Sequence, residues 1–248
     1  MSSHAITRRN FLHSLIASGA SGLIFLPVVG SGGVTEPDKL RGDRVGWARL
    51  RTPSPWWNRH AGGDTFLTHF LRDHTSLNIE PQWQQADHEN LADMCIYPLL
   101  FTQEVDSIQS VSGRKNLAEY IDRGGFLIID SCINVGINPD PDAALARQTH
   151  WLSDFLPAAK VAPLPSDHSV FRCHFQFSTG KPPHTFRESE RWTKHPLYGI
   201  QFGSRLGGVI SMSGLQCGWA REREPLEHRR ACARMLVNIY VYAMMQGR

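Results

Sequence analysis

The sequence predicts an α/β fold, a sandwich in which helices cover a mainly parallel sheet. Short apolar runs alternate along the chain with segments of helical periodicity, as in proteins built from strand–helix–strand units. One run, Phe126–Asp130, is apolar up to its last residue, which is typical of a central strand buried on both faces. The chain has 248 residues, of which 41% are hydrophobic and 20% charged. These values indicate one globular domain and exclude a disordered chain.

The first half of the predicted domain contains strands and helices in alternation. We expect strands at Val45–Arg51, Leu77–Trp83 and Cys95–Phe101. Asp64 can cap a helix after the first strand, and a second helix is expected at about 112–123. Pro98 interrupts the third strand and indicates a bulge or a place near the sheet edge. Gly124 and Gly125 then end the second helix before the central strand.

The second half continues the pattern. A helix is expected from about Asp142 to Phe155, with Pro157 stopping it. Apolar residues alternate with polar ones over Phe171–Phe177, which predicts a strand with one buried and one solvent-exposed face. We expect two more strands at Tyr198–Phe202 and Gly208–Met212, and a last helix opened by Pro225.

The charge balance excludes several classes of protein. Lys and Arg number 26 and Asp and Glu number 23, so the net charge is 26 − 23 = +3. This weak surplus argues against a nucleic-acid-binding protein, which concentrates basic residues in a stripe. The five cysteines include no C-x-x-C pair, and the twelve histidines include no convincing ligand spacing on a helix. We therefore predict no metal site and no cofactor.

The first 33 residues read as an export leader. Arg8 and Arg9, followed by Phe11 and Leu12, resemble the twin-arginine motif, and a mild apolar run over residues 15–29 follows them. This resemblance implies the twin-arginine translocase as a partner and a location in the periplasm or cell envelope. An uncleaved membrane anchor and a chance arginine pair before a buried helix are the alternatives. Residues 34–44 read as a linker, and residues 45–246 as the single α/β domain.

Several segments of the domain, in order, resemble the bacterial domain of unknown function 4159 family. The resemblance rests on Trp47-Ala48-Arg49-Leu50, Ile96-Tyr97-Pro98-Leu99-Leu100, the segment 124–132, the segment 163–171, Cys217-Gly218-Trp219 and the segment 238–243. It implies a flavodoxin-like three-layer sandwich related to class I glutamine amidotransferases. Where that family usually has a Thr-Gly-His-like turn, this chain has Thr102-Gln103-Glu104. A pocket lined by that turn would therefore have different chemistry here.

The main candidate site follows the central strand, at Asp130, Ser131 and Cys132. Ligands bind at the carboxyl ends of strands in open α/β sheets, and the cysteine nucleophile of amidotransferases stands at such a place. The turn here lacks the glycines that such a nucleophile needs, and the His-x-Glu pair expected near Gly203 is absent. In the structural alternative, the Asp130 carboxylate caps the next loop and Cys132 fills space in the core.

A second candidate is the turn that contains Asp167 and His168. Asp167 could orient the imidazole for proton transfer or ligand binding, or both side chains could only stabilise the turn. Trp56, Trp57 and Trp219 could stack on a sugar or an aromatic ligand, or could cover the end of the sheet.

Two functional hypotheses follow, and whether the protein is an enzyme stays open between them. The preferred one is an exported, non-catalytic domain that binds a small molecule or an envelope protein near Asp130, Ser131, Asp167, His168 and Trp219. The alternative is a hydrolase-like enzyme that uses Cys132 or Asp130 with His168.

Overall fold

A computed structural model describes residues 43–131, 140–185 and 189–246. The strands are β1 (Ala48–Arg51), β2 (Gln84–Asp87), β3 (Leu99–Thr102), β4 (Phe126–Asp130), β5 (Ala159–Pro163), β6 (Leu197–Phe202) and β7 (Arg205–Ser211). The helices are α2 (Asp64–His74), α3 (Leu91–Cys95), α4 (Val111–Asp122), α5 (Pro141–Phe155), α6 (Glu190–Thr193), α7 (Leu215–Ala220) and α8 (Leu226–Met245). Three short 3-10 turns are η1 (Ala61–Gly63), η2 (Val105–Ser107) and η3 (Ser169–Phe171). In this part of the chain, no helix is both long and apolar enough to cross a bilayer.

The strands form one seven-stranded sheet in the order β2-β1-β3-β4-β7-β6-β5. All strand pairs from β2 to β7 are parallel, whereas β6 is antiparallel to both of its neighbours. The predicted α/β fold with a mainly parallel sheet is therefore confirmed. The close fit of β4 to β7 needs a glycine, since a Cβ at Gly208 would lie 2.3 Å from the carbonyl oxygen of Leu127.

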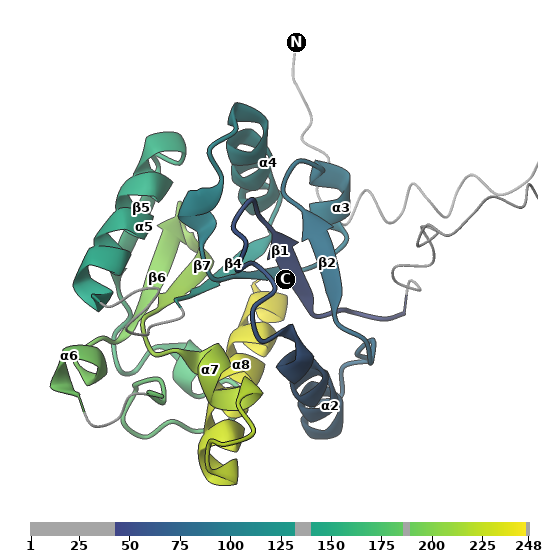
Figure 1. The fold of residues 1–248 in the computed structure, drawn as a ribbon, viewed down its shortest axis with the longest axis vertical. Helices are drawn as coiled ribbons and strands as arrows, with labels where there is room; N and C mark the ends of the chain where they lie inside the picture. The colour runs from purple at the N-terminus through teal and green to yellow at the C-terminus, as the bar shows by residue number, and fades with distance from the viewer. Residues whose placement is uncertain (1–42, 132–139, 186–188, 247–248) are drawn as a thin grey trace, which may run out of the picture. The chain divides into compact units, whose positions relative to one another are not determined.

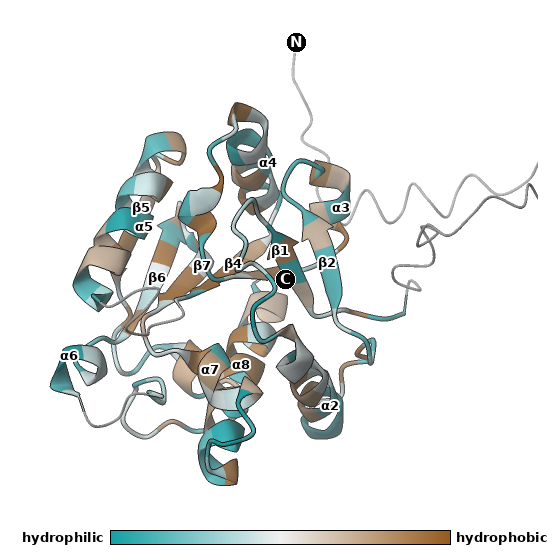
Figure 2. Ribbon diagram, viewed as in Figure 1, coloured by the Kyte–Doolittle hydropathy of each residue, from teal (hydrophilic) through white to brown (hydrophobic). Residues whose placement is uncertain are grey.

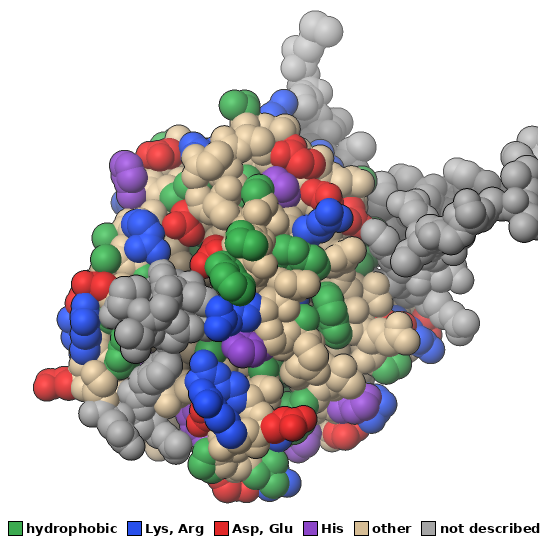
Figure 3. Space-filling view, in the orientation of Figure 1, with side chains coloured by type: hydrophobic (Ala, Val, Ile, Leu, Met, Phe, Trp, Pro, Cys, Tyr) green, Lys and Arg blue, Asp and Glu red, His purple; other side chains and the backbone are tan. Residues whose placement is uncertain are grey.

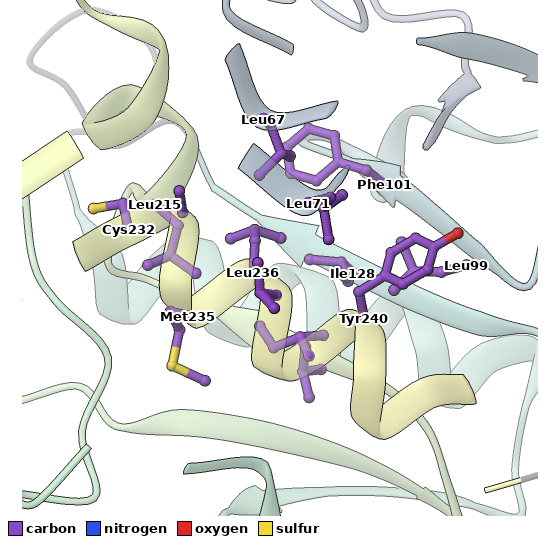
Figure 4. Packing of buried hydrophobic residues seen from close by; sticks show 14 of the residues in the cluster. Leu67, Leu71, Leu99, Phe101, Ile128, Leu215, Cys232, Met235, Leu236 and Tyr240 are labelled. Carbon is purple, nitrogen blue, oxygen red and sulfur yellow. The ribbon is translucent and has the colours of Figure 1, made fainter. Parts of the chain in front are cut away.

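Helices cover both faces of the sheet (Figure 1). In β4, Phe126 and Ile128 pack on the side of α2, α7 and α8, while Leu127 and Ile129 pack on the side of α3, α4 and α5. Both faces of β4 are thus buried, as its apolar sequence predicts, and its bounds are those expected. Figure 2 shows hydrophobic residues concentrated on β4 and β7 in the middle of the sandwich. Figure 4 shows how Leu67 and Leu71 of α2 and residues of α8 converge on the sheet.

Two predicted strands are displaced from their expected positions. The segment 77–83 forms only an isolated bridge, Ile79 to Val45, and the strand β2 begins afterwards at Gln84. The segment 95–101 was expected to be one strand, but its start belongs to α3, which Asn90 caps by accepting the N–H of Asp93. The strand β3 begins only after Pro98, which has no N–H to donate to a sheet.

The strand predicted at 171–177 does not exist in the structure. The segment forms η3 and then an irregular turn, because the buried side chain of Asn238 supplies its hydrogen bonds. Asn238 Oδ1 accepts the N–H of Phe175 at 2.7 Å, and its Nδ2 donates to the carbonyl oxygens of Val170 and Phe175 at 2.9 and 2.8 Å. A side-chain amide on α8 thus replaces a neighbouring strand.

The sequence patterns miss one strand, β5, and three short helices, α3, α6 and α7. The edge strand β5 is mostly exposed, and its sequence Ala-Lys-Val-Ala-Pro contains only one β-branched residue, so it lacks the usual signal of a strand. The helix α7 is short and almost wholly buried, so it shows no amphipathic period.

Candidate functional site

The sheet has a topological switch point between β1 and β3. The chain passes from β1 to β2 on one side and returns to β3 on the other. In open α/β sheets, ligands bind outside the carboxyl ends of the strands at such a point. The segment 52–60 follows β1, and Gln103 and Glu104 follow β3. These two segments flank the switch point.

A buried ion pair anchors the segment after β1. The side chains of Arg49 in β1 and Asp64 in α2 are both 0% exposed. The Arg49 Nε and Nη2 atoms donate to the Asp64 carboxylate at 2.5 and 2.8 Å, and Trp47 Nε1 donates to it at 2.9 Å. Asp64 was expected to cap α2, but Gly63 occupies the cap position and the carboxylate is committed to Arg49. A bidentate pair of this kind fixes orientation as well as charge.

The same arginine holds the backbone of the loop. Arg49 Nη1 donates to the carbonyl oxygens of Trp57 and Arg59 at 3.3 and 3.1 Å. His60, the next residue, has a φ of 57°, a left-handed conformation that is unusual for any residue other than glycine. Backbone strain of this kind costs on the order of 1 kcal/mol and persists only where the surroundings enforce it. Arg49 supports it by holding the carbonyl oxygen of the preceding residue, Arg59.

Six residues then form a closed circuit of contacts at the switch point, which we call the switch-point ring: Ser54, Trp56, Arg59, Gln103, Glu104 and Gln216. The Ser54 hydroxyl donates to the Glu104 carboxylate and accepts the N–H of Trp56 at 3.1 Å. Gln103 Nε2 donates to Gln216 Oε1, and Gln216 Nε2 donates to the Arg59 carbonyl at 2.8 Å. The Arg59 guanidinium lies 5.0 Å from the centre of the Trp56 ring, which closes the circuit.

The ring contains one buried polar atom that has no partner among the described residues. Gln103 is 1% exposed, yet its Oε1 accepts no hydrogen bond from this part of the chain. Thr102, which precedes the ring residue Gln103, is also buried, and its hydroxyl has no described partner either. Buried polar groups without hydrogen bonds are costly and rare, so these two side chains are notable at the carboxyl edge of the sheet.

Asp130 lies at the same edge and caps α7. It is 0% exposed, and its two carboxylate oxygens accept the N–H groups of Leu215 and Gln216 at 3.0 and 2.8 Å. In the structural alternative this carboxylate caps the loop that follows it, and that loop lies outside the described residues; the donors described are the first two residues of α7. A carboxylate at a helix N-terminus is stabilised by the helix dipole as well as by these bonds.

Ser131 is also fully buried. Its hydroxyl accepts a hydrogen bond from Gln148 Nε2 of α5 at 2.7 Å, and its N–H donates to the carbonyl of Ser211 at 3.1 Å. The third predicted residue of this segment, Cys132, lies outside the described residues, as do the leader residues Arg8, Arg9, Phe11 and Leu12.

The structure does not bring His168 to Asp130. The His168 ring lies 5.2 Å from that of Tyr242, which in turn packs on Phe126 at the opposite end of β4 from Asp130. His168 Nδ1 accepts the N–H of Val170 at 3.2 Å and so caps η3. Burial lowers the pKa of His168, which keeps the ring neutral as this acceptor role requires; the neighbouring Asp167 opposes that shift. Asp167 itself is exposed.

The three loop tryptophans differ. Trp219 in α7 is 0% exposed and packs edge-on against Trp47 and Phe101, with ring centres 6.2 and 5.9 Å apart. Trp57 is partly buried, whereas Trp56 is 47% exposed. Of the three, Trp56 is thus the one that offers its ring to solvent.

Sequence reasoning missed the polar members of the ring. Two signals pointed toward it: the departure at Thr102-Gln103-Glu104 and the tryptophan pair in the loop after β1. The link through Gln216 gave no signal, because it joins residues 113 and 157 positions apart. Among the described residues, no three His, Cys, Asp or Glu side chains are grouped so that they could hold a metal ion.

Comparison with known proteins gives one family. The model of a domain of unknown function (DUF4159) matches residues 47–244. No curated protein matches the chain.

Proposed function

This chain belongs to the DUF4159 family, and we propose that its domain is a non-catalytic, amidotransferase-like module that binds a small polar ligand at the switch-point ring. The single observation that carries the proposal is the orphaned, buried Gln103 Oε1 beside the ring's charged members at the switch point. An acceptor left without a donor in the protein is satisfied when a ligand supplies one.

Binding is better supported than the hydrolase-like alternative. That alternative needs a nucleophile and a base within about 3 Å of each other. Asp130 and His168 lie at opposite ends of β4, and each of them is engaged by backbone N–H groups. In the switch-point ring, the Ser54 hydroxyl donates to the Glu104 carboxylate and not to the imidazole that activates a serine nucleophile.

A thermal-shift screen of polar metabolites tests the proposal. A ligand present at 100 times its Kd stabilises the folded state by about 2.7 kcal/mol, which corresponds to about 5–10 °C in Tm for a chain of this size. We expect such a shift in the wild type and its loss in Glu104→Gln. The control Glu119→Gln removes an exposed carboxylate that pairs with Arg123 one helical turn away, and should keep the shift. If no metabolite in the screen raised the Tm of the wild type more than that of Glu104→Gln, the proposal would be contradicted.

We further propose that the domain acts in the cell envelope after export by the twin-arginine translocase. The arginine pair at positions 8 and 9 and the following apolar run support this. Replacing both arginines by lysine should leave the protein in the cytoplasm, as judged by fractionation, while Arg41→Lys should not. Unchanged export of the double variant would refute this route.

A further inference from the structure

We infer that the ligand of the switch-point ring is a saccharide with the glucose configuration, an inference that rests on the proposed function and specifies its ligand. The ring combines an exposed aromatic face, charges of both signs and a buried acceptor without a donor. Each of these three features restricts the chemistry of the ligand.

The aromatic face is that of Trp56. The other large exposed hydrophobic side chains of the described residues, Val111, Leu226 and Met245, are aliphatic and lie on helices. An exposed indole beside polar groups offers a broad apolar platform with little conformational entropy to lose. In the space-filling view, hydrophobic side chains lie next to Lys or Arg and His side chains in front of the sheet (Figure 3).

The charges of the ring exclude strongly charged ligands. The Arg59 guanidinium lies over the Trp56 ring, and Arg59 forms no ion pair with a described residue. Glu104 is linked through Ser54 to the backbone N–H of Trp56, so the switch-point ring also contains a carboxylate. A cation on the indole would be repelled by Arg59, and an anion near Arg59 would be repelled by Glu104. A neutral ligand that both donates and accepts hydrogen bonds suits both groups.

Hydroxyl groups match the acceptors. Ser54 donates to Oε2 of Glu104, which leaves Oε1 as a further acceptor, and Gln103 Oε1 is buried without a donor among the described residues. A pyranose with the glucose configuration carries its hydroxyls equatorially, so its rim donates in the ring plane while both faces present C–H groups. Such a sugar can place one face on Trp56 and donate from its rim to Glu104.

Hydrogen bonds within the protein hold the loop after β1 in place without a ligand. Arg49 fixes the carbonyls of Trp57 and Arg59, and Gln216 holds the Arg59 carbonyl from α7. A loop that is already ordered loses little entropy on binding, which raises affinity without additional contacts.

Titration calorimetry of the full chain with chitotriose and with cellotriose tests the inference. We expect saturable binding of at least one trisaccharide by the wild type. Trp56→Ala and Glu104→Gln should each weaken it at least tenfold, and Trp56→Phe should restore part of the affinity lost in Trp56→Ala. The matched control is Leu226→Ala, since Leu226 is 49% exposed and Trp56 47%, and it should bind within twofold of the wild type.

Inorganic phosphate and tetramethylammonium serve as charged probes in the same titration. If one of them binds in a manner that depends on Glu104 or Trp56 while neither trisaccharide does, the saccharide assignment is overturned and the proposed function stands. Trisaccharide binding that survives both Trp56→Ala and Glu104→Gln places the sugar elsewhere and also overturns it. If none of the four probes binds, the saccharide assignment fails, and the metabolite screen decides the proposed function separately.

Discussion

Replacing Arg49 by alanine is expected to lower the free energy of unfolding by about 3–5 kcal/mol. The substitution leaves the Asp64 carboxylate buried with only the Trp47 indole N–H among the three donors described above. It also removes the donor to the carbonyls of Trp57 and Arg59, so the strained conformation of His60 loses its support. Urea denaturation followed by circular dichroism measures the change.

The control for this variant is Arg72→Ala. Arg72 also pairs with an aspartate, Asp73 at 3.1 Å, but both side chains are about half exposed. Exposed pairs contribute little, so this variant should change stability by less than about 1 kcal/mol. Arg49→Lys should remain strongly destabilised, since an ammonium cannot form the bidentate contact. Equal losses in Arg49→Ala and Arg72→Ala would show that the buried pair does not anchor the loop.

Stability is also expected to fall as the pH decreases from about 6.5 to about 4. Burial lowers the pKa of His184 to about 4, the nearby His195 backbone opposes that shift, and the positive charges of His195, Lys181 and His228 act in the same direction as burial. The unfolded chain therefore takes up this proton near pH 6.5, while the folded protein takes it up only near pH 4. Between these values the unfolded state binds more protons, so acid favours it, by on the order of 3 kcal/mol.

Denaturation at pH 7, 5.5 and 4.5 measures this effect. His184→Asn should flatten the profile, with the slope that remains coming partly from His168 and His195, whose pKa values burial also lowers. His69→Ala is the control, because His69 is exposed on α2 and should leave the slope unchanged. If the free energy of unfolding fell equally steeply with decreasing pH in the wild type and in His184→Asn, the assignment of the effect to His184 would be contradicted.

The sequence could predict the parts of the fold that depend on local patterns. The strand β4 was predicted to the residue, because Phe126–Ile129 is apolar on both faces and a pair of glycines precedes it. The prediction over 171–177 was wrong, because a strand-like alternation is also compatible with a turn whose hydrogen bonds come from Asn238, about 65 residues away. The strand β5 was missed because its sequence, Ala-Lys-Val-Ala-Pro, contains only one β-branched residue and ends in proline.

The candidate site was harder to predict because its contacts join residues that lie far apart in the sequence. Asp130 and Ser131 at the carboxyl end of β4 were candidate site residues, and in the structure both are buried with partners from α5 and α7. The switch-point ring joins segments after β1, after β3 and in α7, and its contacts depend on which strands are neighbours in the sheet. No single segment contains that information.

Fluorine NMR of the protein labelled with 5-fluorotryptophan tests the central claim most directly. The chain has seven tryptophans, and the resonance of Trp56 is the one that disappears in Trp56→Phe. On titration with chitotriose and, separately, with cellotriose, we expect the Trp56 resonance to move until saturation with at least one of them, while those of the fully buried Trp47 and Trp219 stay in place. A Trp56 resonance that moves with neither trisaccharide at any concentration would contradict saccharide binding at the switch-point ring.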